Sequence, residues 1–176
     1  QLDELFEDAG RWFFTMERID GVPFTSFVRP QGLDEARLRH SLAQLAEGLR
    51  VLHRAGMIHR DVKPSNALVE STGRVVLLDF GLVANVGIRI EGCAGRAGTV
   101  AYMAPEQAAG EEGPAADWYA VGVMLYEALT GKLPFAGPAH VILARKAASL
   151  PPPPSTRAQG LPADLEHLCL ALLASD

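Results

Sequence analysis

The stretch "HRDVKPSN", His59 to Asn66, places an acid, a cation and an amide within one short segment that also contains a proline. These groups suit phosphoryl transfer, which depends on positioning and charge neutralisation more than on covalent chemistry by the protein. An aspartate can accept the proton of an attacking hydroxyl, a lysine can neutralise the transferred group, and an asparagine can bind magnesium. Asp61, Lys63 and Asn66 offer these groups from one loop, and Asp79, after the apolar run "RVVLL", offers a second magnesium ligand.

The composition is that of an ordinary globular domain. The chain has 176 residues, of which 48% are hydrophobic and 21% are charged. A net charge of −5 argues against a nucleic-acid partner. Cys93 and Cys169 are far apart and lack metal-ligand spacing, which favours a reducing, cytoplasmic location. No apolar run reaches transmembrane length, so no membrane segment is expected within these residues.

The hydrophobic pattern predicts a mainly helical chain with a few short strands. Leucines at helical spacing predict a helix within residues 33–56, and the run 117–131, apolar on all sides, predicts a central helix. Further helices are expected over residues 138–149 and 162–176. Strands are expected over residues 12–16, 57–59, 66–70 and 74–79. Residues 80–113 have an irregular, glycine-rich pattern, and 151–154 are expected to be extended.

Four segments together resemble parts of the eukaryotic-like protein kinases: "HRDVKPSN", "DFG" (79–81), "GTVAYMAPE" (98–106) and "DWYAVG" (117–122). In that family they are the catalytic loop, the magnesium loop, the substrate-docking segment and the central helix. A lysine two residues after the aspartate is typical of serine/threonine kinases, and "YMAPEQAAG" looks most like bacterial members. The resemblance implies an α+β, protein-kinase-like fold with a mainly helical C-terminal lobe and an N-terminal lobe that is largely absent.

On this resemblance, residues 1–176 are expected to form a partial protein kinase domain. Its parts are the hinge strand 12–20, the catalytic loop 59–66, the activation segment 79–106 and the helical remainder 117–176. The sequence has no lysine before Lys63 and no G-x-G-x-x-G motif. The family's glycine-rich loop and small-lobe lysine are therefore expected to come from the parent chain.

The resemblance implies catalytic roles for particular residues. Asp61 resembles the catalytic base, and Lys63 resembles the lysine that contacts phosphate. Asn66 and Asp79 resemble magnesium ligands, and Thr99 resembles the threonine that bonds to the base and the lysine. The implied cofactors are ATP and Mg²⁺, and the implied partner is a protein substrate with a Ser or Thr acceptor.

The segment "FTMERIDG" (14–21) resembles the hinge strand that binds adenine. The nucleotide contacts that this implies are Met16 as gatekeeper, the backbones of Glu17 and Ile19 at the purine, Asp20 at the ribose and Leu68 beneath the adenine.

Three further residues resemble structural or docking positions of the family. Arg60 resembles the arginine that often grips a phosphate on the activation loop, but residues 82–98 contain no Ser, Thr or Tyr. We therefore expect a loop that is ordered without phosphorylation. Glu106 resembles the acid that pairs with an arginine expected beyond the last helix. Asp117 resembles the helix acid that orients the backbone of the catalytic loop.

Two alternatives to an active serine/threonine kinase stay open on the sequence. A pseudokinase would use the fold as a binding or scaffold module, and its upstream segment would lack the strand lysine. A small-molecule phosphotransferase also uses an Asp-then-Asn loop, although "KP" after Asp61, "DFG" and "APE" favour a protein substrate. The simpler structural interpretations are a loop ion pair for Asp61 with Lys63, braced turns for Asn66 and Asp79, and a solvated acid for Asp20.

These 176 residues alone are expected to bind ATP weakly and to have negligible activity. The reason is that the glycine-rich loop and the small-lobe lysine hold the phosphates in this family, and the sequence contains neither. The measurement is a calorimetric titration of the chain with Mg-ATP. Micromolar affinity would contradict the expectation.

Overall fold

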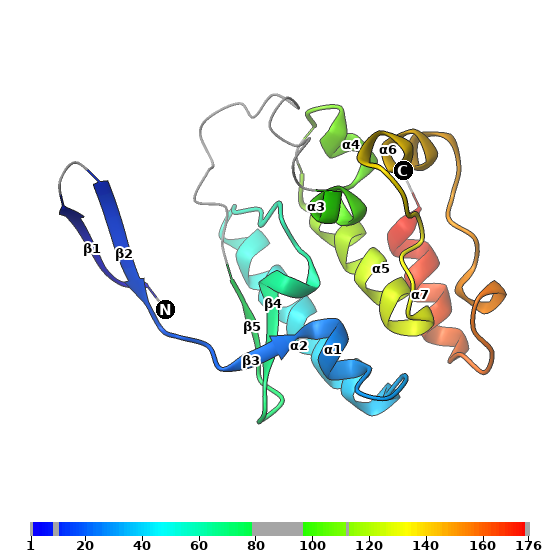
Figure 1. Ribbon diagram of the computed structural model, residues 1–176, viewed down its shortest axis with the longest axis horizontal. Helices are drawn as coiled ribbons and strands as arrows, with labels where there is room; N and C mark the ends of the chain where they lie inside the picture. The colour runs from blue at the N-terminus through cyan, green and yellow to red at the C-terminus, as the bar shows by residue number, and fades with distance from the viewer. Residues whose placement is uncertain (1, 9–10, 79–96, 112, 175–176) are drawn as a thin grey trace.

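The computed structural model describes residues 2–8, 11–78, 97–111 and 113–174. The strands are β1 (Leu2–Asp8), β2 (Arg11–Met16), β3 (Gly21–Pro23), β4 (Ala67–Glu70) and β5 (Val75–Leu77). The helices are α1 (Phe24–Val28), α2 (Glu35–Arg54), α3 (Ala97–Tyr102), α4 (Pro105–Ala108), α5 (Pro114–Thr130), α6 (Ala139–Ala148) and α7 (Ala163–Leu173) (Figure 1). Short 3₁₀ turns cover Pro64–Asn66 and Pro154–Thr156.

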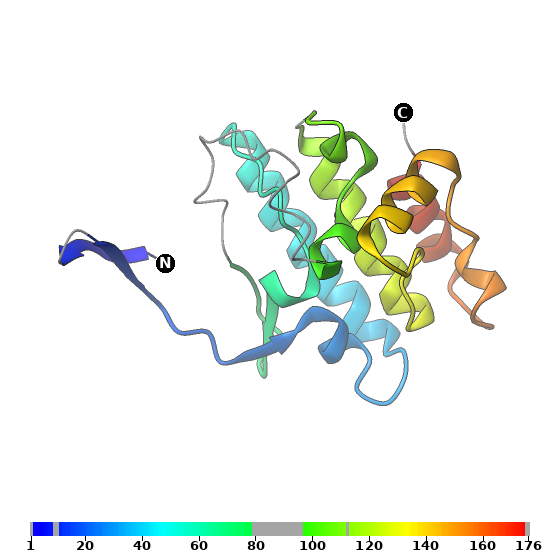
Figure 2. The same cartoon turned by 45° about the horizontal axis from the view of Figure 1, so that its top comes forward.

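Helix α5 lies at the centre of the helical body, as its apolar sequence predicts (Figure 2). It carries buried side chains on all its faces, and it packs against α2, α3 and α7. Pro114 begins the helix and Gly131 ends it with a left-handed φ of 72°, a conformation that glycine adopts without strain. Neither α5 nor any other described helix is long and apolar enough to cross a membrane.

Helix α2 is amphipathic and packs its leucine face against this centre. The side chain of Asp34 caps its N-terminus by accepting a hydrogen bond from the N–H of Arg37 at 3.0 Å. The leucines at helical spacing are all at most 9% exposed: Leu38, Leu42, Leu45, Leu49 and Leu52. The sequence prediction for this helix is therefore confirmed.

The strands form two separate antiparallel sheets. In the first, β4 lies between β3 and β5, and Val69 is opposite both Val22 and Val75. In the second, β1 pairs with β2, with Phe6 opposite Phe13. This hairpin lies apart from the helical body, at the end of an extended segment, in both views (Figure 1; Figure 2). The loop that begins at His59, in contrast, leads directly into β4 of the three-stranded sheet through the turn Pro64–Asn66.

Two local predictions are wrong. Residues 57–59 form no strand, because the backbone N–H of His59 bonds to the side chain of Asp117 and not to a neighbouring strand. The end of the segment expected to be irregular forms the helices α3 and α4. Pro105 begins α4, and the side chain of Gln107 caps it by accepting a hydrogen bond from the N–H of Ala104 at 2.9 Å. Residues 79–96, which include most of the predicted activation segment, lie outside the described residues.

Replacing Gly122 with alanine should destabilise the fold by about 1–3 kcal/mol, the usual range for overpacking a core. Gly122 lies in α5, where an added Cβ would come within 2.9 Å of Cβ of Leu172 and 3.1 Å of a methyl of Leu173 on α7. Urea-induced unfolding measures the change in stability.

The matched control is Gly48→Ala in α2. Its Cβ would meet only a methyl of Leu77 at 3.4 Å, which is ordinary contact, so the better helix former should raise stability by about 0.5–1 kcal/mol. Equal effects of the two substitutions would contradict the close approach of α5 and α7.

Candidate active site

Asp117, in the first turn of α5, holds the backbone of the loop that carries Asp61. Its carboxylate belongs to a side chain that is 1% exposed, and it accepts hydrogen bonds from the N–H groups of His59 (2.9 Å) and Arg60 (2.8 Å). It also accepts one from Nε2 of His53 (2.7 Å). Because a carboxylate only accepts, Nε2 of His53 carries the proton. Several donors compensate the burial of this charge, and together they join the loop to the central helix.

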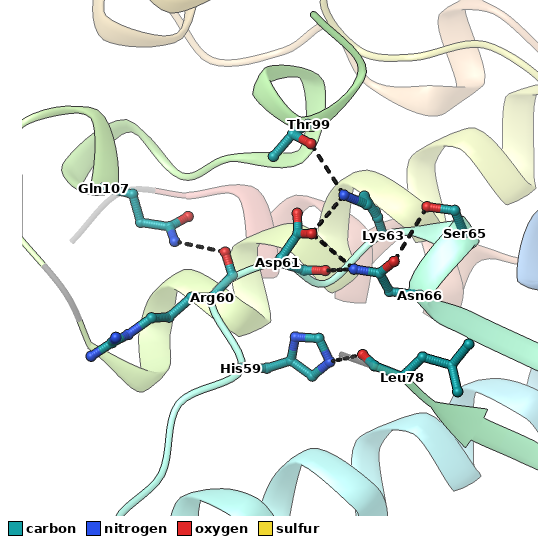
Figure 3. A network of polar contacts seen from close by, with 9 residues as sticks. All are labelled: His59, Arg60, Asp61, Lys63, Ser65, Asn66, Leu78, Thr99 and Gln107. Atoms are coloured by element: carbon teal, nitrogen blue, oxygen red, sulfur yellow. Dashed lines mark hydrogen bonds and ion pairs between the residues drawn. The ribbon is translucent and has the colours of Figure 1, made fainter. Parts of the chain in front are cut away.

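The backbone at Arg60 turns the loop. Its φ is 69°, in the left-handed region that costs a non-glycine residue about 1–2 kcal/mol. The carbonyl of Arg60 accepts a hydrogen bond from Nε2 of Gln107 at 3.3 Å. On one side of the turn, Nε2 of His59 donates to the carbonyl of Leu78 at 3.0 Å, while Asp61 points to the other side (Figure 3).

The carboxylate of Asp61 is the centre of a polar cluster. Its Oδ2 accepts hydrogen bonds from Nζ of Lys63 (2.6 Å) and Nδ2 of Asn66 (2.9 Å). Nδ2 of Asn66 also donates to the backbone carbonyl of Asp61 at 2.8 Å. The other carboxylate oxygen of Asp61, Oδ1, is buried and has no hydrogen-bond partner among the described residues. It lies on the side that faces Thr99 (Figure 3). Hydrogen bonds from the protein thus fix one oxygen of the Asp61 carboxylate, and the other oxygen can accept a further hydrogen bond.

Lys63 connects this cluster to helix α3. Its ammonium donates to Oγ1 of Thr99 at 3.1 Å as well as to Asp61. Pro64 begins the 3₁₀ turn that follows, where its fixed φ and missing N–H fit without cost. The N–H of Asn66 then donates to the carbonyl of Lys63 at 2.9 Å, which closes the turn. The spacing of lysine, proline and asparagine therefore brings both side chains back onto Asp61.

The chemistry of Asn66 fits a magnesium ligand. Because its Nδ2 is used by Asp61, its Oδ1 points away from that residue, where Oγ of Ser65 approaches only to 3.5 Å. Amide oxygens are donors that Mg²⁺ prefers. The backbone carbonyl of Asn66 accepts from the N–H of Leu78 at 2.8 Å, and the next residue is Asp79, which lies outside the described residues. The described residues contain no group of three acids, histidines or cysteines able to hold a metal.

The predicted nucleotide residues lie along one stretch of the chain and on β4. Met16 is the last residue of β2, and Glu17, Ile19 and Asp20 follow in the extended link to β3. Glu17 is close to Arg74, with Oε1 at 3.4 Å from Nη1, and Asp20 is exposed. Leu68 is half-buried on β4, opposite Pro23 of β3 and Val76 of β5. The sheet therefore holds Leu68 next to the strand that the link enters.

Glu106 is half-buried in α4 and forms no ion pair among the described residues. Burial, and to a smaller extent the nearby charge of Glu106, raises the pKa of the Tyr119 phenol in α5 well above its usual range. The arginine that the sequence led us to expect for Glu106 is thus not among its described contacts.

A pocket of about 510 Å³ opens beside the loop. Its lining includes Pro23 of β3, Thr25 of α1, Ser65 of the loop, and Thr99 and Tyr102 of α3. The ammonium of Lys63 also borders it, so the polar cluster around Asp61 lies at its edge. A polypeptide segment that entered this pocket would bring a side chain toward that cluster.

Sequence reasoning missed two residues that hold the loop. His53 bonds to Asp117, and Gln107 bonds to the carbonyl of Arg60. His53 stands in the last turn of α2, where a cationic or polar residue is common at any helix end. Gln107 follows the motif "APE" by one residue. Neither position has a local signal, because each contact joins segments that are far apart in the sequence.

A loop with an aspartate, a lysine and an asparagine on one cluster, fixed by an aspartate of the central helix, defines the class of phosphotransferases built like protein kinases. The sequence pattern of the protein kinase domain matches residues 1–173. The chain therefore belongs to the protein kinase family, and the expected fold class and family are confirmed.

Two bacterial kinases match the chain at substantial identity. The serine/threonine-protein kinase PknB of Mycobacterium tuberculosis is 38% identical over 170 residues, which is 93% of this chain and 27% of that protein. The serine/threonine-protein kinase PknA of the same organism is 41% identical over 158 residues, which is 87% of this chain and 35% of that protein. The chain thus spans about a third or less of the length of these relatives.

Replacing Asp117 with asparagine should lower the free energy of unfolding by about 3 kcal/mol, because an amide nitrogen would face backbone N–H groups that now have a charged acceptor. Chemical unfolding in urea gives the measurement. Asp164→Asn, at an exposed carboxylate paired with Arg39, is the matched control and should have a much smaller effect. Similar losses in both variants would show that Asp117 does not hold the loop.

Proposed function

We propose that this chain carries the phosphoryl-transfer half of a serine/threonine protein kinase, which moves the γ-phosphoryl group of ATP to a Ser or Thr hydroxyl of a protein substrate. The observation that carries the proposal is the state of Asp61. Lys63 and Asn66 fix one oxygen of its carboxylate, and the other is buried without a hydrogen-bond partner among the described residues. A general base needs such an acceptor, already oriented, at the point where the substrate hydroxyl arrives.

The roles of the neighbouring groups follow from their charges and contacts. Asp61 accepts the proton of the substrate hydroxyl while the oxygen of that hydroxyl attacks the γ-phosphorus of ATP and the bond to ADP breaks. Lys63, which already bonds to Asp61 and Thr99, is placed to neutralise charge on the transferred group. The pocket lined by Thr25, Ser65 and Tyr102 is where we place the substrate segment. Arg60 and Asp117 keep the loop in this geometry, and Glu106 belongs to the docking segment.

ATP and Mg²⁺ are the proposed cofactors. Asn66 and Asp79 are the proposed magnesium ligands, and the oxygen chemistry described for Asn66 fits that role. When bound, Mg²⁺ neutralises charge on the phosphates. Met16, Glu17, Ile19, Asp20 and Leu68 are the proposed contacts of the nucleotide. Because ATP is abundant in the cytoplasm, the proposal places the domain there.

Two experiments separate this proposal from its alternatives. A pseudokinase would transfer no phosphoryl group in the intact parent protein, and its upstream segment would lack the strand lysine. A small-molecule phosphotransferase would modify small hydroxyl compounds and not proteins in a substrate panel.

The domain parts proposed are the hinge strand 12–20, the catalytic loop 59–66, the activation segment 79–106 and the helical remainder 117–176.

In the intact kinase, Asp61→Asn should lower kcat by about 10²–10⁴-fold, the usual contribution of a general base. The amide keeps the size of the side chain but cannot accept the proton. Phosphate incorporation into a Ser/Thr peptide measures the rate. Asp164→Asn makes the same chemical change on an exposed surface and should leave kcat unchanged. Equal rates for Asp61→Asn and the wild type would rule out the proposed base.

A further inference from the structure

The side chain of Lys146 is buried against the segment that follows Thr99. Lys146 lies in α6 and is 6% exposed. Its ammonium donates hydrogen bonds to the backbone carbonyls of Val100 (3.1 Å), Ala101 (2.7 Å) and Met103 (2.7 Å). An ammonium has three N–H donors, so these carbonyls use all of them.

The carbonyls lie at the C-terminal end of α3. The last carbonyls of a helix have no partner within the helix, and a cation there also complements the helix dipole. Lys146 therefore closes the end of α3 from a different helix. On the other side, the ring of Tyr119 from α5 faces the ammonium, 5.1 Å from the ring centroid.

No carboxylate among the described residues forms an ion pair with this ammonium. Burial lowers the pKa of Lys146 to about 7, so the charged form is costly to hold in this position. A methionine could fill similar space without that cost. A methionine would, however, leave the bound carbonyls without a donor, so the three hydrogen bonds offset the desolvation of the ammonium and fix the backbone that it binds.

The end of α3 is connected to the catalytic loop. Val100 directly follows Thr99, whose hydroxyl accepts a hydrogen bond from Lys63 at 3.1 Å. The N–H of Met103 donates to the carbonyl of Thr99 at 3.2 Å. Lys63 in turn donates to Asp61 at 2.6 Å. A shift of α3 would therefore move the hydroxyl of Thr99 relative to both charged residues.

We propose that Lys146 is a positioning residue for the docking segment: its ammonium holds the carbonyls of Val100, Ala101 and Met103 and thereby keeps Thr99 at Lys63 and Asp61. The hold on α3 is a property of this chain by itself. Only the last step, from Thr99 to catalysis, rests on the proposed function.

The first test is hydrogen–deuterium exchange of the chain at pH 6, where Lys146 carries its proton. The reporters are the amides of Met103, bonded to Thr99, and Ala104, bonded to Gln107. In Lys146→Met both amides should exchange at least tenfold faster, while exchange in α5 stays unchanged. Lys132→Met, at an exposed lysine, should change neither. Unchanged reporters, or equal acceleration in α5, would overturn the proposal.

A second variant keeps the test decisive if Lys146→Met does not fold. Lys146 borders a pocket of about 260 Å³, through which a small amine can enter the space left by Lys146→Ala. Propylammonium should restore folding, or slow exchange at Met103 and Ala104 with saturation, and 1-propanol of similar size should not. Restoration by both compounds, or by neither, would show that the charge is not what holds α3.

The link to catalysis has a separate readout in the intact kinase. Lys146→Met should raise KM for a peptide substrate at least tenfold and leave KM for ATP within twofold, with Lys132→Met unchanged. If Lys146→Met exchanges faster at Met103 and Ala104 but has an unaltered KM for the peptide, the proposed effect of Thr99 on catalysis is overturned. A wild-type kinase that transfers no phosphoryl group would overturn the proposed function and leave the exchange result standing.

Discussion

The contact between Asp117 and the backbone of residues 59 and 60 is the constraint on which the site depends. Helix α5 is buried on all its faces, so its first turn is fixed by the whole core. A carboxylate on that turn transfers this fixed position to a loop that has no regular structure of its own. The packing of the helical body therefore sets the path of the backbone that leads to Asp61, through the buried Asp117 carboxylate.

Cations bound to backbone carbonyls are a second principle of this fold. Nη1 of Arg29 donates to the carbonyl of Ala128 at 2.6 Å, at the end of α5. Arg157 donates to the carbonyl of Leu133 at 2.7 Å, in the loop that follows. Lys146 does the same for α3. Each side chain satisfies carbonyls that a helix end or loop leaves without partners, and each joins segments that are distant in the sequence.

The sequence predicts best what depends on neighbours along the chain. The leucine spacing of α2, the end of α5 at Gly131 and the grouping of Asp61 with Lys63 are all local patterns, and the structure contains them. The capped helix α4 was missed because its cap comes from Gln107, in a stretch whose glycines suggested irregular backbone. The carbonyl contacts of Lys146 could not be predicted, since they depend on where α6 packs and not on any motif.

The left-handed backbone of Arg60 has a consequence for how the site comes into being. An isolated loop peptide would avoid this conformation, because a residue with a Cβ is strained in it. The loop holds this shape because the packed helix α5 presents the Asp117 carboxylate to its backbone. The geometry of the site thus depends on the core: a chain whose core is loose would contain every residue of the site but would hold them in the wrong relation to one another.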